Sequence, residues 1–107
     1  MTKKELQKHE NFLVLDTMVL AVGEFHESVR EDITLKRLRY CTAWVYETKN
    51  YYTLKSYNTF IACIDKATGV TYDSLRYAYK FTRTSAQHIN KFMQDYGSGK
   101  RYTFRKV

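Results

Sequence analysis

The sequence of 107 residues contains no proline, only four glycines and only two cysteines. Glycines at positions 23, 69, 97 and 99 do not form a GxxxxGK(S/T) or GxGxxG loop, which excludes the usual nucleotide-phosphate loops. A zinc site needs about four Cys or His ligands at short paired spacings. Cys41 and Cys63 are far apart and the histidines are scattered, so we expect no metal site and no cofactor. Each cysteine lies in an apolar stretch, which favours core packing over a redox role.

Long hydrophobic runs are also absent. A membrane span needs about 18 to 20 consecutive apolar residues, and residues 1–6 lack the apolar segment of a signal peptide. Hydrophobic residues nevertheless make up 44% of the chain and aromatic residues 16%, which is too much for a disordered chain. We therefore expect one soluble, cytoplasmic domain spanning residues 1–107, with no membrane partner.

The N-terminal part, residues 1–39, is predicted to be mainly helical. Thr2 followed by Glu5 fits a capping box. Apolar residues then recur at steps of three and four, which predicts an amphipathic helix facing a core. A strand beginning at residues 11–15 is the alternative, and residues 30–39 are a charged continuation or connection. The apolar positions are Phe12, Leu15, Val19, Val22, Phe25 (or His26) and Val29.

Residues 40–107 are predicted to form a sheet and a second helix. Segments 42–47, 51–57, 59–65 and 70–81 are rich in aromatic and β-branched residues, and they predict an antiparallel meander of about four or five strands. Turns fall at 48–50 and 66–69, where Asn50 or Gly69 can take positive φ. The fold class is therefore α+β.

A C-terminal amphipathic helix packed on the sheet is predicted from about Ser85 to Tyr96. Residues 84–87 fit a second capping box, and Gly97 is the expected C-terminal cap. Residues 100–107 could add an edge strand or remain a mobile basic tail, and the alternation of Tyr102 and Phe104 favours the strand.

Charge is distributed unevenly along the chain, whose net charge is +7. Residues 1–53 carry eight Lys or Arg and eight Asp or Glu, whereas residues 54–107 carry ten against three. A field of one sign attracts polyanions such as nucleic acid or acidic protein surfaces.

Two groups of residues in the basic half are candidate binding sites. Arg83, His88 and Lys91 surround the start of the C-terminal helix, where an anion could bind; plain capping with solvent-facing charge is the alternative. The second group could bind nucleic acid or a protein partner, unless its aromatic residues face the core and its cations are simply solvated. It comprises Arg76, Lys80, Lys100, Arg101, Arg105 and Lys106, interleaved with Tyr77, Tyr79, Tyr102 and Phe104.

Residues 54–59 (LKSYNT), 61–65 (IACID) and 79–92 (YKFTRTSAQHINKF) resemble a small uncharacterised family of phage and mobile-element proteins from Gram-positive and gut bacteria. Members of that family carry an SYxT strand followed by SRTTxxHI at the opening of a helix. This chain has FTRTS where the family tends to have YSRTT, and the change preserves the cap. The resemblance implies a phage or mobile-element origin and a bacterial host cell, but no activity.

The sequence predicts a binding protein rather than an enzyme, because no nucleophile has a base and orienting group and no carboxylate pair is suggested. The leading hypothesis is a non-enzymatic phage-type accessory protein that binds a nucleic acid or nucleoprotein target. An anti-CRISPR-type inhibitor of a host effector is one such protein. The alternatives are a free-standing DNA-binding regulator and, less favoured, a phage structural or assembly component, which predicts self-association such as a homodimer.

Overall fold

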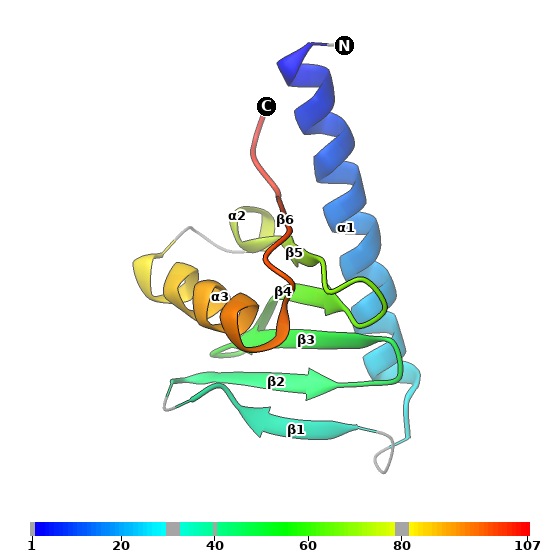
Figure 1. Ribbon diagram of the computed structural model, residues 1–107, viewed down its shortest axis with the longest axis vertical. Helices are drawn as coiled ribbons and strands as arrows, with labels where there is room; N and C mark the ends of the chain where they lie inside the picture. The colour runs from blue at the N-terminus through cyan, green and yellow to red at the C-terminus, as the bar shows by residue number, and fades with distance from the viewer. Residues whose placement is uncertain (1, 30–32, 40, 79–81) are drawn as a thin grey trace.

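The computed structural model describes residues 2–29, 33–39, 41–78 and 82–107. They form the predicted α+β architecture, with an N-terminal helix, a six-stranded sheet and a C-terminal helix (Figure 1). The elements in chain order are α1 (Lys3–Glu27), β1 (Thr34–Arg37), β2 (Ala43–Glu47), β3 (Tyr51–Ser56), β4 (Thr59–Asp65), β5 (Thr71–Asp73), α2 (Leu75–Ala78), α3 (Arg83–Tyr96) and β6 (Arg101–Thr103).

The sheet is mixed, with strands in sequence order from β1 to β6. The first five strands form an antiparallel meander, of which β2 to β5 were predicted. Strand β6 pairs with β5 in parallel, from Thr71 opposite Arg101 to Asp73 opposite Thr103. A parallel neighbour requires a crossover. Helices α2 and α3 supply it, and the edge strand expected within residues 100–107 is confirmed.

The predicted strand over residues 70–81 is wrong beyond Asp73. Asp73 Oδ1 accepts a hydrogen bond from Leu75 N at 2.9 Å, and Ser74 O accepts from Ala78 N at 2.9 Å. Short polar side chains that bond to nearby backbone compete with a strand ladder, so the chain turns into α2. Residues 79–81 lie outside the described residues.

The predicted helical part, residues 1–39, also needs correction, because Thr34–Arg37 is the first strand of the sheet. All four of its residues are exposed, and Lys36 and Arg37 are among them. Cations on an edge strand discourage pairing with another chain. Residues 34–37, which the sequence suggested to be part of a charged connection, therefore form the solvated edge strand of the sheet.

Helix α3 covers one face of the sheet and closes the larger core. Ile89 and Phe92 of α3 are fully buried against Val45, Leu54 and other apolar side chains of the strands. The helix begins at the N-cap Thr82, whose side chain accepts from Ser85 N, two residues before the predicted capping box. Gly97 is the predicted C-cap.

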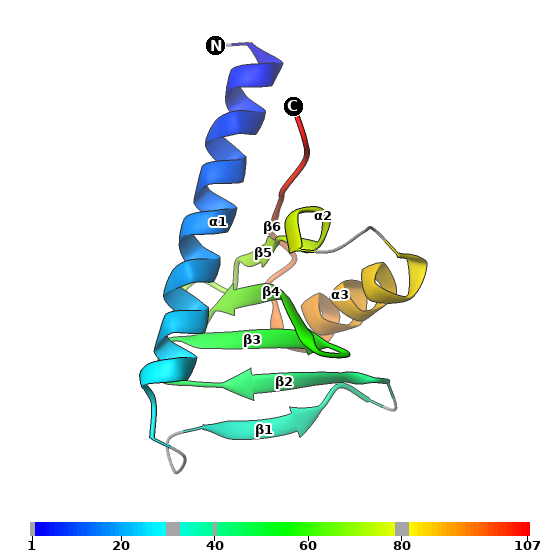
Figure 2. The same ribbon diagram turned by 180° about the vertical axis from the view of Figure 1, so that it is seen from behind.

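Helix α1 covers the opposite face, as the two views of the ribbon show (Figures 1 and 2). Its N-cap is the predicted Thr2, which accepts from Glu5 N at 3.1 Å. The predicted buried stripe is wrong at Phe12 and Val19, which are 67% and 71% exposed, whereas Val22 packs against the core. The helix is apolar around much of its circumference, so periodicity did not single out one face. The buried positions are Asn11, Val14, Met18 and Ala21.

Gly69 fixes the turn that leads into β5. Its φ of +75° confirms one of the two predicted positions for positive φ, and a Cβ there would lie 2.8 Å from Ser98 Cβ. Ser98 N donates to Gly69 O at 2.8 Å, which holds the start of the last segment beside the sheet. Tyr57, in the turn between β3 and β4, has a φ of +53°, whereas Asn50 does not have positive φ.

Both cysteines are free, with Cys63 buried as expected and Cys41 half-buried. Burial strongly raises the pKa of the Cys63 thiol, which keeps it protonated and unreactive. Among the residues that the structure describes, no helix is both long and apolar enough to span a membrane.

Candidate nucleic-acid interface

The C-terminal segment lies along the N-terminal half of α1 and is held there by one buried amide. Asn11 Nδ2 donates to Arg105 O at 2.6 Å, and Arg105 N donates to Asn11 Oδ1 at 2.9 Å. Gln7 Nε2 adds a bond to Thr103 O at 3.1 Å. Because the Asn11 side chain pairs with both backbone groups of one residue, it fixes the segment in register. The two chain ends therefore meet at one end of the molecule (Figures 1 and 2).

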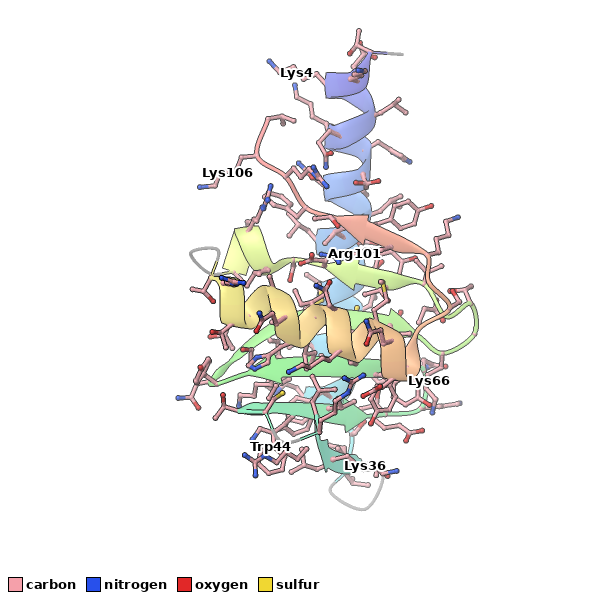
Figure 3. The ribbon with its side chains drawn as sticks, turned by 60° about the vertical axis from the view of Figure 1, so that its left-hand side comes forward. Lys4, Lys36, Trp44, Lys66, Arg101 and Lys106 are labelled. Carbon is pink, nitrogen blue, oxygen red and sulfur yellow. The ribbon has the colours of Figure 1, made fainter. Side chains whose placement is uncertain are left out.

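This meeting gathers cations from both ends of the chain. Lys4 and Lys8 lie one turn apart on α1, and Lys106 follows the clamped Arg105. Figure 3 shows Lys4 and Lys106 at the same end of the molecule. The ring of Tyr77, next to Arg76 on α2, lies 5.3 Å from the ring of Phe104, which brings α2 beside the segment. We call this surface the basic pole; its residues are Lys3, Lys4, Lys8, Arg76, Arg105 and Lys106.

The pole is open to solvent. All six residues are exposed. Within the described residues, the ion pairs join Arg39 to Asp95, Lys66 to Glu47 and Arg101 to Asp73, so the lysines of the pole are not neutralised by them. Exposed lysines of this kind are the groups that neutralise phosphates on a nucleic acid backbone.

Arg101, a predicted binding residue, has a structural role in this arrangement. Its guanidinium pairs with the buried carboxylate of Asp73 at 2.5 Å and donates to Asn90 Oδ1 at 3.1 Å. It thereby joins β6 to β5 and to α3. Because this charge is already paired, Arg101 contributes less to a polyanion site than an exposed lysine.

Lys100 and Tyr102, two further predicted binding residues, contact each other. The Lys100 ammonium is 5.4 Å from the centroid of the Tyr102 ring, a cation–π contact. Tyr102 is half-buried and packs against Tyr72 at 5.7 Å and against the core under α1. The aromatic residues of the C-terminal segment therefore pack mainly inward, as the alternative interpretation had it.

The structure does not assemble Arg83, His88 and Lys91 into one anion site. His88 is 3% exposed, and its Nδ1 lies 2.8 Å from Ser56 Oγ on β3. Burial, with the nearby Lys91 ammonium, lowers the pKa of His88, so the ring is held neutral. Lys91 Nζ donates to Cys41 Sγ at 3.2 Å, and Arg83 is exposed at the first turn of α3. The predicted binding residue Lys80 lies outside the described residues.

Lys3, Lys4 and Lys8 were missed because the charges of residues 1–53 cancel in sum. Within that half, however, residues 3–8 carry three lysines against one acid, Glu5, whereas the last turns of α1 carry Glu24 and Glu27 and no Lys or Arg. Partial burial acts to raise the pKa of Glu24, but hydrogen bonds from Thr48 and Asn50 outweigh it and lower the pKa. The segregation of charge along α1 was the available signal.

A hollow of about 610 Å³ lies between α1, the β3–β4 turn and α2. Its walls include Leu15, Val19, Phe60 and Tyr77. Its described lining contains no carboxylate, histidine or cysteine, so it offers no acid–base pair or nucleophile with a base. The described residues also form no cluster of three His, Cys, Asp or Glu that could hold a metal ion.

The fold and the surface together define an α+β domain with a mixed sheet and a basic pole to which both ends of the chain contribute. Comparison of this chain with protein-family models, curated proteins and solved structures found no match. Function is therefore inferred from the surface itself.

Proposed function

We propose that this protein is a non-enzymatic binder of nucleic acid, free or within a nucleoprotein, and that the basic pole is its main electrostatic contact. The observation that carries the proposal is the Asn11 clamp, which holds Arg105 and Lys106 beside the lysines of α1. Clusters of Lys and Arg on one surface attract the phosphate backbone and make binding strongly dependent on salt.

The shape of the pole suits contact with a backbone. Figures 1 and 2 show the first half of α1 projecting beyond the sheet, accompanied by the chain end. A projecting arm can approach phosphates without the sheet colliding with the nucleic acid. The cations are mostly lysines, which act as point charges on phosphates rather than as readers of base edges, so we expect little sequence preference.

Inhibition of a host CRISPR effector is a narrower form of the same proposal, in which the phosphates belong to a guide RNA or an assembled complex. It rests on the resemblance to phage and mobile-element proteins. A pull-down with purified effectors tests it separately from binding to free nucleic acid.

The first test is a titration of labelled single-stranded and duplex DNA at about 50 and about 200 mM salt. Phosphate-driven binding should weaken by orders of magnitude over this range if six or more contacts form, and by less with fewer. The double variant Lys4→Gln/Lys8→Gln should weaken binding to both forms. It should also make the dependence of log K on log salt shallower by about 1 to 2.

The matched control is Lys36→Gln/Lys49→Gln, which removes the same charge from exposed lysines outside the pole. This variant should bind almost as the parent does. Equal loss in both variants would show that net charge, and not the pole, sets affinity. Absence of binding to either nucleic acid at low salt would refute the proposal for free nucleic acid.

A further inference from the structure

One corner of the sheet is covered only in part by α1. The last turns of α1 reach β2 through Phe25, whose ring lies 4.8 Å from that of Tyr46. Trp44 precedes Tyr46 by two residues and therefore points to the same face of the sheet. Its side chain is 39% exposed, and Figure 3 places it at the end of the molecule opposite Lys4.

Strand register places a cation on each side of Trp44. Arg37 on β1 and Lys55 on β3 are its direct cross-strand partners, so the three side chains share one face. The Arg37 guanidinium carbon lies 6.0 Å from the centroid of the indole ring, at the outer range of a cation–π contact. We call Arg37, Trp44 and Lys55 the tryptophan row.

A β-bulge on the neighbouring strand completes the corner. Leu54 pairs with Ala62 and Lys55 pairs with Phe60, so Ile61 has no partner on β3. The extra residue turns Phe60 to the α1 face, where Lys55 Nζ lies 5.4 Å from its ring centroid. Bulges that redirect a side chain are common next to functional sites.

The charged side chains that the structure describes on this face of β1, β2 and β3 are cations. The described side chains on this face of β1, β2 and β3 include no carboxylate; they are Leu35, Arg37, Trp44, Tyr46, Tyr51, Thr53 and Lys55. Glu47, the acid in these strands, points to the other face and pairs with Lys66. An exposed indole between two cations is complementary to a base whose flanking phosphates carry negative charge.

We infer that Trp44 stacks on an unpaired base of single-stranded nucleic acid, with Arg37 and Lys55 on the phosphates beside that base. This inference rests on the proposed function. It specifies that the nucleic acid is single-stranded and that the tryptophan row is a second contact, in addition to the basic pole. Bases inside a duplex are already stacked, so the tryptophan row distinguishes a single strand from a duplex, which the basic pole does not.

Trp44 is the single tryptophan of the chain, so intrinsic fluorescence reports on the row directly. The protein is titrated with a fluorescein-labelled single strand of about 16 nucleotides, as DNA and as RNA, and with a duplex of equal length. Anisotropy of the label measures binding, and tryptophan emission measures contact at the row. We expect both single strands to quench the emission and the duplex to leave it nearly unchanged.

Variants separate stacking from charge. Trp44→Leu should weaken single-strand binding about tenfold to a hundredfold, whereas Trp44→Tyr should retain most of the affinity because a ring remains. Arg37→Gln should weaken binding, and the matched variant Lys36→Gln should not, because Lys36 points to the other face of the same strand. Circular dichroism confirms that each variant is folded, and Arg37→Gln tests the row even if Trp44→Leu does not fold.

The outcomes distinguish this inference from the proposed function. Single-strand binding seen by anisotropy, without quenching and without loss in Trp44→Leu, overturns the inference and leaves the proposed function intact. Equal quenching by duplex overturns the preference for a single strand. Tryptophan emission that shifts with protein concentration alone assigns the corner to a second copy of the chain and overturns the inference. Absence of binding by both probes refutes the proposed function for free nucleic acid together with the inference.

Discussion

The two faces of the sheet are covered to different extents. On the α3 face, Phe92 and Ile89 are fully buried against the strands, and the buried His88 is bonded to Ser56. On the α1 face, the helix crosses one part of the sheet, leaves Trp44 partly exposed and projects its first half beyond the strands (Figures 1 and 2). The comparison indicates that the α3 face is the more completely closed part of the fold, while the α1 face carries both surfaces that we propose for binding.

The largest effect is expected from a matched pair of Phe→Ala variants, one on each face of the sheet. Phe92→Ala should lower the free energy of unfolding by about 3 to 5 kcal/mol, because it leaves a cavity in the closed core. Phe12→Ala, on the 67% exposed side chain of α1, should change it by no more than about 0.5 kcal/mol. Urea unfolding followed by circular dichroism measures both. Similar losses in the two variants would show that the outer side of α1 is covered in solution.

A smaller effect is expected for Asn11→Ala, which removes the clamp on the C-terminal segment. Loss of its two part-buried hydrogen bonds to Arg105 should cost about 1 to 3 kcal/mol of unfolding free energy, because a typical hydrogen bond contributes about 0.5 to 1.5 kcal/mol. Amide exchange of residues 103–107 should accelerate more than exchange in α3, and salt-sensitive nucleic acid binding should weaken. Unchanged exchange in this segment would show that the pole does not depend on the clamp.

The smallest effect is a pH dependence of the protein's stability, which arises from His88 on the α3 face. Burial and Lys91 lower the pKa of His88 below its ordinary value of 6.5, so the unfolded chain takes up a proton more readily than the folded protein. The stability that neutral His88 supports is complete above about pH 6.5 and decreases as pH falls toward the lowered pKa.

Urea midpoints at about pH 7.5 and about pH 5.5 measure this decrease. The variant His88→Asn, which keeps a polar atom for Ser56 but does not titrate, should show a smaller difference between the two midpoints. The lowered pKa values of Glu24 and Asp95 act in a more acidic range, below about pH 4.5. An equal difference in the variant and the parent would assign the pH dependence to other groups.

Local signals predicted most of the elements. The strands over residues 43–47, 51–56 and 59–65 followed from aromatic and β-branched composition, and the C-terminal end of α3 followed from Gly97. The N-cap of α3 is Thr82, two residues before the predicted capping box. The strand predicted over residues 70–81 was wrong because Asp73 and Ser74 turn the backbone with local hydrogen bonds. Composition does not reveal such bonds, since they depend on the side-chain conformation at the end of a strand.

The sequence by itself determined the α+β class, the helical N-terminus, the meander and the excess of positive charge, because caps, turns and periodicity act over a few residues. Tertiary structure decided which face of α1 is buried, that His88 lies inside, and that β6 runs parallel to β5. It also decided that lysines of residues 3–8 join Arg105 and Lys106, and that Arg37, Trp44 and Lys55 form one row. These features join segments distant in the chain, and their placement depends on packing and register rather than on local preference.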